Sequence, residues 1–287
     1  MKTEEKAFQK KSIFARAKMS QAELDKYYEE YRKDRYEKGL GVGGLFWRKV
    51  LHPVLLAGIK AERVIRGNSI TIIDDKRRKS DKPRIYACTH IGGHDVETCF
   101  EAIKEHAFLF IGDPREAYRN FDGLLLFLNG MICLETRSKS DRKIAKETAV
   151  KFLYRGGNIL IYPEGVWNIT ENLLVNPIFM GTASMALKTG ADIIPMAVEQ
   201  YGKRFIVNIG ENIDSTLWEK EKIPELSEYL RDQMATLKWE IIEYNGFQPY
   251  ESITDELRNN WIDSIFSRAN YSYTVQDVYE TQYGSRN

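Results

Sequence analysis

Residues 84–95 read Arg-Ile-Tyr-Ala-Cys-Thr-His-Ile-Gly-Gly-His-Asp, and this stretch indicates the class of fold. Its first half, residues 84–89, is a short and mostly apolar run of the kind that forms a buried strand. The two adjacent glycines allow a tight turn, and a helix is predicted from Asp95 to about His106. A buried strand that leads through a glycine turn into a helix is typical of α/β folds.

Strand and helix patterns alternate through the residues that follow. Alternation of this kind favours an α/β fold with a central, mostly parallel sheet flanked by helices. Strands are predicted at residues 69–73, 84–89, 108–111, 131–134, 158–162 and 193–199, with an edge strand at 204–209. Helices are predicted at residues 95–106, 115–128, 139–154 and 182–188.

Helical patterns on both sides of this region divide the chain into three parts. Residues 1–66 form an N-terminal helical segment, in which Ser20 is the expected cap of a charged helix. Residues 67–210 form the α/β core. Residues 211–287 form a C-terminal extension, helical over residues 226–244 and expected to be irregular after Gly246.

Composition excludes several classes of protein. The chain has 287 residues, of which 43% are hydrophobic, so it is not intrinsically disordered. The formal net charge is +1, which gives no overall attraction to nucleic acid, and no nucleic-acid partner is expected. Basic residues outnumber acidic ones over residues 1–66, and the reverse holds over residues 211–287. The basic segment is therefore a candidate for contact with an anionic surface, unless both ends are simply solvated helices.

The cysteines and the apolar runs of the sequence indicate the cellular compartment of the protein. The three cysteines, Cys88, Cys99 and Cys133, form neither a disulfide framework nor a zinc-ribbon spacing, as in proteins of a reducing compartment. The longest uncharged run, residues 172–187, is shorter than the about 20 apolar residues of a membrane-spanning helix. Residues 1–11 are highly charged and lack the apolar core of a signal peptide. A cytoplasmic protein is expected.

One segment of the N-terminal part carries a membrane-surface pattern. From Leu45 to Leu55, apolar residues that include Phe46 and Trp47 recur every three to four positions, interleaved with basic residues. Such a helix can lie in a bilayer interface or pack on a protein core, with a kink or a start near Pro53. Both interpretations remain open from the pattern alone.

The residues between the strand at 84–89 and the next helix are the leading candidates for chemistry. Ligand sites in parallel α/β sheets gather at the carboxyl ends of strands, which is where His90 stands. Asp95 follows in the first helical turn, and the glycine turn can fold its carboxylate back against the imidazole. Such a pair fixes the imidazole tautomer and stabilises the imidazolium that forms when the other ring nitrogen takes a proton.

Other interpretations of these residues remain. His90, His94 and Asp95 could hold a metal, but two glycines between the histidines make a poor helix and no further ligand cluster is evident. His90 could instead be a structural residue that caps the helix. A cysteine nucleophile is disfavoured, because Cys88 lies within the predicted strand and Cys99 on a helix face.

Four motifs follow one another in the order of a known family. They are His90 with Asp95, the run Gly130 to Arg137, Tyr162-Pro-Glu-Gly165, and Ile194-Pro-Met196. In this order and at strand ends they resemble the lysophospholipid acyltransferase family, which includes the 1-acylglycerol-3-phosphate O-acyltransferases. The resemblance covers roughly residues 64 to 210.

The resemblance implies transfer of a fatty acyl group from an acyl-CoA or acyl-carrier-protein thioester to a hydroxyl of a lysophospholipid-like acceptor. The resemblance also implies that His90 is the general base, that Asp95 orients His90, and that the reaction needs neither a metal nor a cofactor. Because a thioester is already activated, a base and oxyanion stabilisation suffice, and the backbone N–H groups of Gly92 and Gly93 are candidates for the latter. It also implies a membrane surface as partner, on the inner face. The substrate-binding candidates are Gly92, Gly93, Arg137, Glu164, Gly165, Trp167 and Pro195.

Two departures from the family pattern concern the acceptor. Where the family has Glu-Gly-Thr-Arg, this chain has Glu164-Gly-Val-Trp167, and an indole cannot supply the arginine's charge to an acceptor phosphate. Gly130 and Arg137 are also one position further apart than in the family, and Arg115, Arg119 and Arg142 are alternative sources of charge. In place of the arginine's role, Trp167 would either stack on a sugar or pack against other side chains of the protein. Weaker use of phosphorylated acceptors is expected; the alternatives are a glycolipid or amino-lipid acceptor, or a non-catalytic lipid-binding protein.

Overall fold

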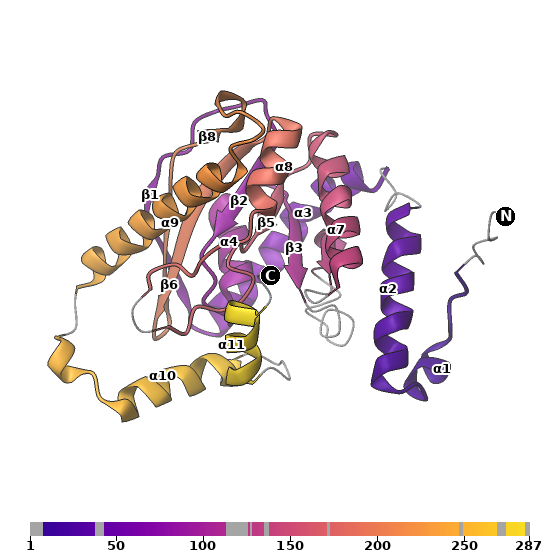
Figure 1. The fold of residues 1–287 in the computed structure, drawn as a ribbon. Helices are drawn as coiled ribbons and strands as arrows, with labels where there is room; N and C mark the ends of the chain where they lie inside the picture. Colours follow the sequence, from indigo (N-terminus) through magenta and orange to yellow (C-terminus); the bar gives the residue numbers. More distant parts are fainter. Residues whose placement is uncertain are drawn as a thin grey trace.

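The computed structural model describes residues 8–37, 43–112, 126, 128–134, 138–170, 173–246, 249–268 and 274–284. Within them the chain builds an eight-stranded sheet in the order β1-β7-β6-β2-β5-β3-β4, with β8 paired to β6 (Figure 1). The α/β architecture expected from the sequence is therefore confirmed. The strands are β1 Ser69–Asp75, β2 Arg84–Cys88, β3 Phe108–Gly112, β4 Met131–Leu134, β5 Ile159–Ile161, β6 Asp192–Tyr201, β7 Arg204–Ile209 and β8 Ile213–Asp214.

Most strand pairs are parallel, and the exceptions lie on one side of β6. β2 pairs in parallel with both β5 and β6, whereas β6 pairs antiparallel with β7 and with β8. The prediction of residues 204–209 as an edge strand is wrong, because β7 lies between β6 and β1. A tight turn at Gly202, whose φ is +61°, returns β7 directly along β6, and β1 then adds outside it.

Helices cover both faces of the sheet because alternate side chains of the central strands point to opposite sides. Ile85 and Ala87 of β2 belong to the core under α7, α8 and α9, whereas Tyr86 and Cys88 belong to the core under α4. Figure 1 shows α9 running across the first of these faces. These helices are α4 Asp95–Ile103, α7 Lys139–Leu153, α8 Gly181–Thr189 and α9 Ile223–Asn245.

The N-terminal helices are α1 Ile13–Ala17, α2 Gln21–Glu37 and α3 Gly43–Ile65. Ser20 caps α2 as predicted: its Oγ accepts the backbone N–H of Glu23 at 3.4 Å, and its own backbone N–H donates to the Glu23 carboxylate at 2.7 Å, which completes a capping box. Arg32 of α2 forms a buried ion pair with Asp141 at 2.7 Å, which attaches α2 to α7. Pro53 lies inside α3 and does not end it.

The C-terminal part contains more helix than predicted. After Gly246 the chain forms the short 3-10 turn Tyr250–Ser252 and the helices α10 Asp255–Arg268 and α11 Val275–Gly284. Another 3-10 turn, Ser215–Leu217, lies before α9. Figure 1 places α10 and α11 beyond one end of the sheet. The expectation of an irregular segment was wrong for these residues, since α10 has a weak amphipathic pattern and only a few of its side chains are buried.

His106 is a buried histidine at the amino end of β3. Its Nε2 lies 2.6 Å from the backbone carbonyl of Asn129, and burial lowers the pKa of His106 to about 4. In the unfolded chain the same imidazole titrates at about 6.5. The unfolded state therefore binds more protons between these values, so the stability that His106 contributes is present above pH 6.5 and is lost as the pH falls towards 4.

We expect a His106→Gln variant to lose less stability in acid than the wild-type protein. Glutamine keeps an N–H donor for the Asn129 carbonyl but cannot be protonated in this range. Between pH 7 and pH 5 the wild type should lose about 2 kcal/mol more unfolding free energy than the variant. Urea unfolding at the two pH values measures this, and equal losses would show that His106 is not buried in its neutral form.

Candidate active site

The registers of two neighbouring strands bring His90 and Glu164 together. Ala87 of β2 is paired with Ile161 of β5, so the residues three positions further on meet at the carboxyl edge of the sheet. The backbone N–H of His90 donates to Glu164 Oε1 at 3.0 Å, and the N–H of Asn176 donates to Oε2 at 2.8 Å. A buried carboxylate thus fixes the backbone from which the imidazole projects.

His90 and Asp95 are in direct contact. His90 Nδ1 lies 2.7 Å from Asp95 Oδ2, which also accepts the backbone N–H groups of Ile91 at 3.0 Å and Gly92 at 2.9 Å. A carboxylate that accepts from Nδ1 assigns the proton to that nitrogen and leaves Nε2 as the acceptor. The Asp95 side chain is 1% exposed and that of His90 14%, so only the histidine reaches solvent.

Two aromatic rings fix the orientation of the imidazole. Tyr162, just after β5, stacks on His90 with ring centroids 4.2 Å apart, and Trp167 approaches edge-on at 6.2 Å. Burial raises the pKa of Tyr162 well above its usual value, so the phenol stays neutral at physiological pH. With Nδ1 held by Asp95 and one ring face covered by Tyr162, the imidazole has little freedom to rotate.

The glycines of the turn have different roles. Gly92 and Gly93 have φ values of +77° and +65°, which explains the choice of glycine at both positions. The Gly92 N–H, an expected oxyanion donor, instead donates to Asp95 and is not available to an oxyanion while that bond is in place. Among the described residues no acceptor meets the Gly93 N–H, so this donor is the remaining candidate of the two.

Trp167 is a packed residue in this structure. It is 7% exposed and belongs to a cluster with Val166 and Ile169 and with Ile265 and Val278 of the C-terminal helices. Its indole also covers Gly92, where an added Cβ would lie 3.1 Å from the ring. The position at which the resemblance expects an arginine is therefore filled by an indole between the Gly92–Gly93 turn and the C-terminal extension.

Glu164 is completely buried and surrounded by compensating groups. Burial raises the pKa of Glu164, and the ammonium of Lys238 and the backbone N–H groups of Asn176 and His90 act in the opposite direction. Because both carboxylate oxygens accept backbone N–H groups, the described contacts make Glu164 a residue that positions the loops rather than a ligand for substrate.

The remaining predicted residues lie further from the dyad or outside the described residues. Gly165, with φ at +71°, allows the close approach of Phe179, since an added Cβ would lie 2.5 Å from that ring. Pro195 is buried within β6, paired with Ala87, and packs towards Gly210. Arg137, Arg115 and Arg119 lie outside the described residues.

The alternatives to an acid–base site find little support. His94 Nε2 lies 3.1 Å from Arg66 and so belongs to a different contact from His90. Among the described residues no group of three or more His, Cys, Asp or Glu side chains is placed to hold a metal ion. Cys88 lies 3.4 Å from Cys99, and burial raises the pKa of the Cys88 thiol well above its usual range, which makes it a poor nucleophile.

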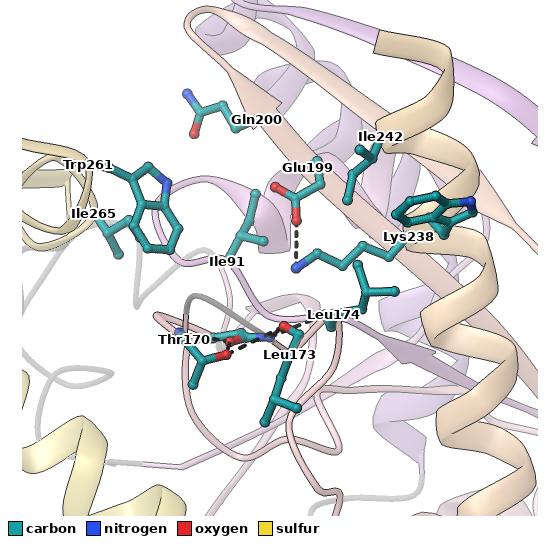
Figure 2. Close-up of a pocket in the computed structure, with 12 residues that line it drawn as sticks. Ile91, Thr170, Leu173, Leu174, Glu199, Gln200, Lys238, Ile242, Trp261 and Ile265 are labelled. Atoms are coloured by element: carbon teal, nitrogen blue, oxygen red, sulfur yellow. Dashed lines mark hydrogen bonds and ion pairs between the residues drawn. The ribbon is translucent and has the colours of Figure 1, made fainter. Parts of the chain in front are cut away.

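One feature of this edge of the sheet was not predicted. Lys238 of α9 forms an ion pair with Glu199 of β6 at 2.7 Å, beside a cavity of about 400 Å³ (Figure 2). Burial lowers the pKa of Lys238, but the Glu199 and Glu164 carboxylates outweigh it and raise the pKa overall. The only signal in the sequence is a lysine next to the apolar stripe of α9, and such residues are usually exposed.

Comparison with known proteins identifies similar chains. Residues 69–199 match the family model Acyltransferase. The 1-acyl-sn-glycerol-3-phosphate acyltransferase of Borreliella burgdorferi is 27% identical over 183 residues, which are 62% of this chain and 63% of that relative. The crystal structure of the 1-acyl-sn-glycerophosphate (LPA) acyltransferase PlsC from Thermotoga maritima has the same fold, with a TM-score of 0.55 at 16% identity over 70% of this chain and 83% of that one.

Proposed function

We propose, from the premise that residues 69–199 form a domain of the Acyltransferase family, that this chain is an O-acyltransferase. It moves a fatty acyl group from an acyl-CoA or acyl-carrier-protein thioester to a hydroxyl of a lysophospholipid-like acceptor. The observation that carries the proposal is the contact of 2.7 Å between His90 Nδ1 and Asp95 Oδ2, which leaves Nε2 as a proton acceptor at the edge of the sheet.

In the proposed reaction His90 acts as general base and then as general acid. Nε2 takes the proton of the acceptor hydroxyl while the oxygen attacks the thioester carbonyl, and Asp95 stabilises the imidazolium that forms. The tetrahedral intermediate then collapses, its C–S bond breaks, and the leaving thiolate takes the proton back from Nε2. The products are an ester and a free thiol, and no metal or cofactor enters the balance.

The oxyanion of the intermediate requires a hydrogen-bond donor near the dyad. We assign the Gly93 N–H to this role, since the Gly92 N–H is held by Asp95. Gly93 also stands just before α4, whose N-terminus carries a partial positive charge.

An acyl-transfer assay tests the proposal. The purified chain, a radiolabelled long-chain acyl-CoA and a mixture of monoacyl lipids should yield diacyl products and free CoA in equal amounts. Lipid binding without any thiol release, under conditions in which the protein is folded, would instead indicate the non-catalytic lipid-binding alternative.

We also propose that α3 binds a membrane surface on the cytoplasmic side. No helix of the described residues is long and apolar enough to cross a bilayer. The α3 helix nevertheless exposes apolar side chains, with Phe46 66% and Trp47 68% exposed, next to Arg48 and Lys49. Such a combination suits the interface of an anionic bilayer, where both substrates of the proposed reaction would reside.

We expect a Phe46→Glu, Trp47→Glu variant to lose binding to anionic vesicles. Burial of each aromatic side chain contributes about 1.5–3 kcal/mol, so the bound fraction should fall by about tenfold or more. Flotation with vesicles that contain phosphatidylglycerol measures this. Leu217→Glu is the control, since Leu217 is also exposed but lies outside α3, and an equal loss in the control would contradict a role for α3.

A further inference from the structure

A cavity adjoins the dyad on the α9 side of the sheet. It has a volume of about 400 Å³ and is lined by Ile91, which follows His90, and by Asn168, whose backbone N–H donates to the His90 carbonyl at 3.0 Å. This volume is within the range of small-molecule sites, about 300–1,000 Å³. A group bound here would therefore contact the residue that follows His90 in the chain.

The walls of the cavity combine aromatic rings with a charge pair. Trp239 of α9 and Trp261 of α10 both line it and are 42% and 44% exposed, so part of each indole is accessible. Glu199 and Lys238 also line the cavity, and Figure 2 shows their charged ends pointing towards each other. The pair adds no net charge, because its two charges are opposite.

A phosphate monoester would fit these walls poorly. Its two negative charges would lose solvation beside the Glu199 carboxylate, whose attraction already holds the Lys238 ammonium. Trp167, at the position of the expected arginine, is packed against Phe266 and offers no positive charge. The groups that face the cavity therefore favour a head group without a formal charge.

Hydroxyl groups suit the same walls well. A hydroxyl both donates and accepts, so it can donate to the Glu199 carboxylate and accept from the Lys238 ammonium without breaking their contact. The apolar C–H faces of a sugar or polyol can pack on the rings of Trp239 and Trp261. The walls thus satisfy both the polar and the apolar surfaces of such a group.

We propose that this cavity holds the head group of the acyl acceptor and that the head group is a neutral sugar or polyol. The proposal rests on the proposed acyltransferase function and names its acceptor class. Lys238, Trp239, Trp261 and Ile265 all lie outside residues 69–199, which match the family model. Acceptor choice is therefore set by this chain's C-terminal extension, through α9 and α10.

The first test compares two acceptors that carry the same single acyl chain. One is a monoacyl glycosylglycerol, and the other is 1-acylglycerol-3-phosphate. The wild type should use the glycosyl acceptor with a kcat/KM at least tenfold higher. Trp261→Ala and Trp239→Ala should each raise the KM for the glycosyl acceptor about tenfold or more, with kcat and the KM for acyl-CoA changed by less than about twofold. Tyr244→Ala is the matched control, because Tyr244 is an exposed aromatic residue of α9 that does not line the cavity.

The second test measures binding without turnover. Octyl glucoside below its micellar concentration should change the tryptophan fluorescence of the wild type and of Tyr244→Ala saturably, and it should not do so in Trp261→Ala. Absence of saturable binding, or preference for the phosphorylated acceptor with unchanged KM in both tryptophan variants, would overturn the inference alone. Absence of acyl transfer to either acceptor, with glucoside binding intact, would overturn the proposed enzyme and with it the acceptor assignment.

Discussion

Replacement of His90 by alanine should reduce kcat/KM for acyl transfer by about 10²–10⁴-fold, the usual contribution of a general base. No other imidazole among the described residues stands in its place, since the nearest in the sequence, His94, contacts Arg66. Steady-state assays with labelled acyl-CoA measure the loss. Circular dichroism and urea unfolding should match the wild type closely, because the His90 side chain is partly exposed and its removal leaves the Glu164 contact to the backbone in place. A folded variant with wild-type rates would exclude His90 as the base.

Replacement of Asp95 by asparagine should reduce kcat/KM by about 10²-fold or more while the side-chain size is kept. The amide has no negative charge to stabilise the imidazolium, and its NH₂ group can turn the wrong tautomer of His90 towards the acceptor. The variant should also be less stable, because Oδ2 accepts two backbone N–H groups at the buried start of α4. Activity is therefore compared at a temperature well below its unfolding midpoint.

Glu97→Gln is the matched control for Asp95→Asn. It removes one carboxylate from the same first turn of α4, but Glu97 lies beside His94 at 3.9 Å. The control should keep activity within about threefold of the wild type. If both variants lose activity equally, the loss is explained by the negative electrostatic potential of the carboxylates in the first turn of α4 and not by the contact between Asp95 and His90.

The fold and the dyad were predictable because they depend on local patterns. The alternation of apolar strands and helices indicated the layered sheet, and the glycines between β2 and α4 indicated a turn able to bring Asp95 back to His90. Five positions of chain separate these two residues, so the geometry of one turn decides their contact. In both cases the information lies within a short stretch of sequence.

The surroundings of the dyad were not predictable, because they depend on contacts between distant segments. Trp167 packs against Phe266, and Lys238 pairs with Glu199, only because α9 and α10 return to the edge of the sheet. Neither helix pattern indicates which face meets which strand. The position of β7 inside the sheet was not predictable for the same reason. The same sequence pattern suits a strand at the edge of a sheet and a strand one position further in.

Competition for hydrogen-bond donors also limits prediction from the sequence. Gly92 and Gly93 are equivalent in the sequence as sources of backbone N–H groups. The structure separates them, because Asp95 Oδ2 accepts the N–H of Gly92 and that of Ile91 in addition to His90 Nδ1. The sequence separation between Asp95 and His90 does not show how many N–H donors the Asp95 carboxylate accepts.

The most direct test of the account is the acyl-transfer rate of the double variant His90→Ala, Asp95→Asn. Because Asp95 acts on the reaction only through the imidazole, the double variant should be within about twofold of His90→Ala alone. A double variant that is slower than His90→Ala by the full factor of Asp95→Asn would mean that the two residues act independently, and the proposed dyad would be contradicted.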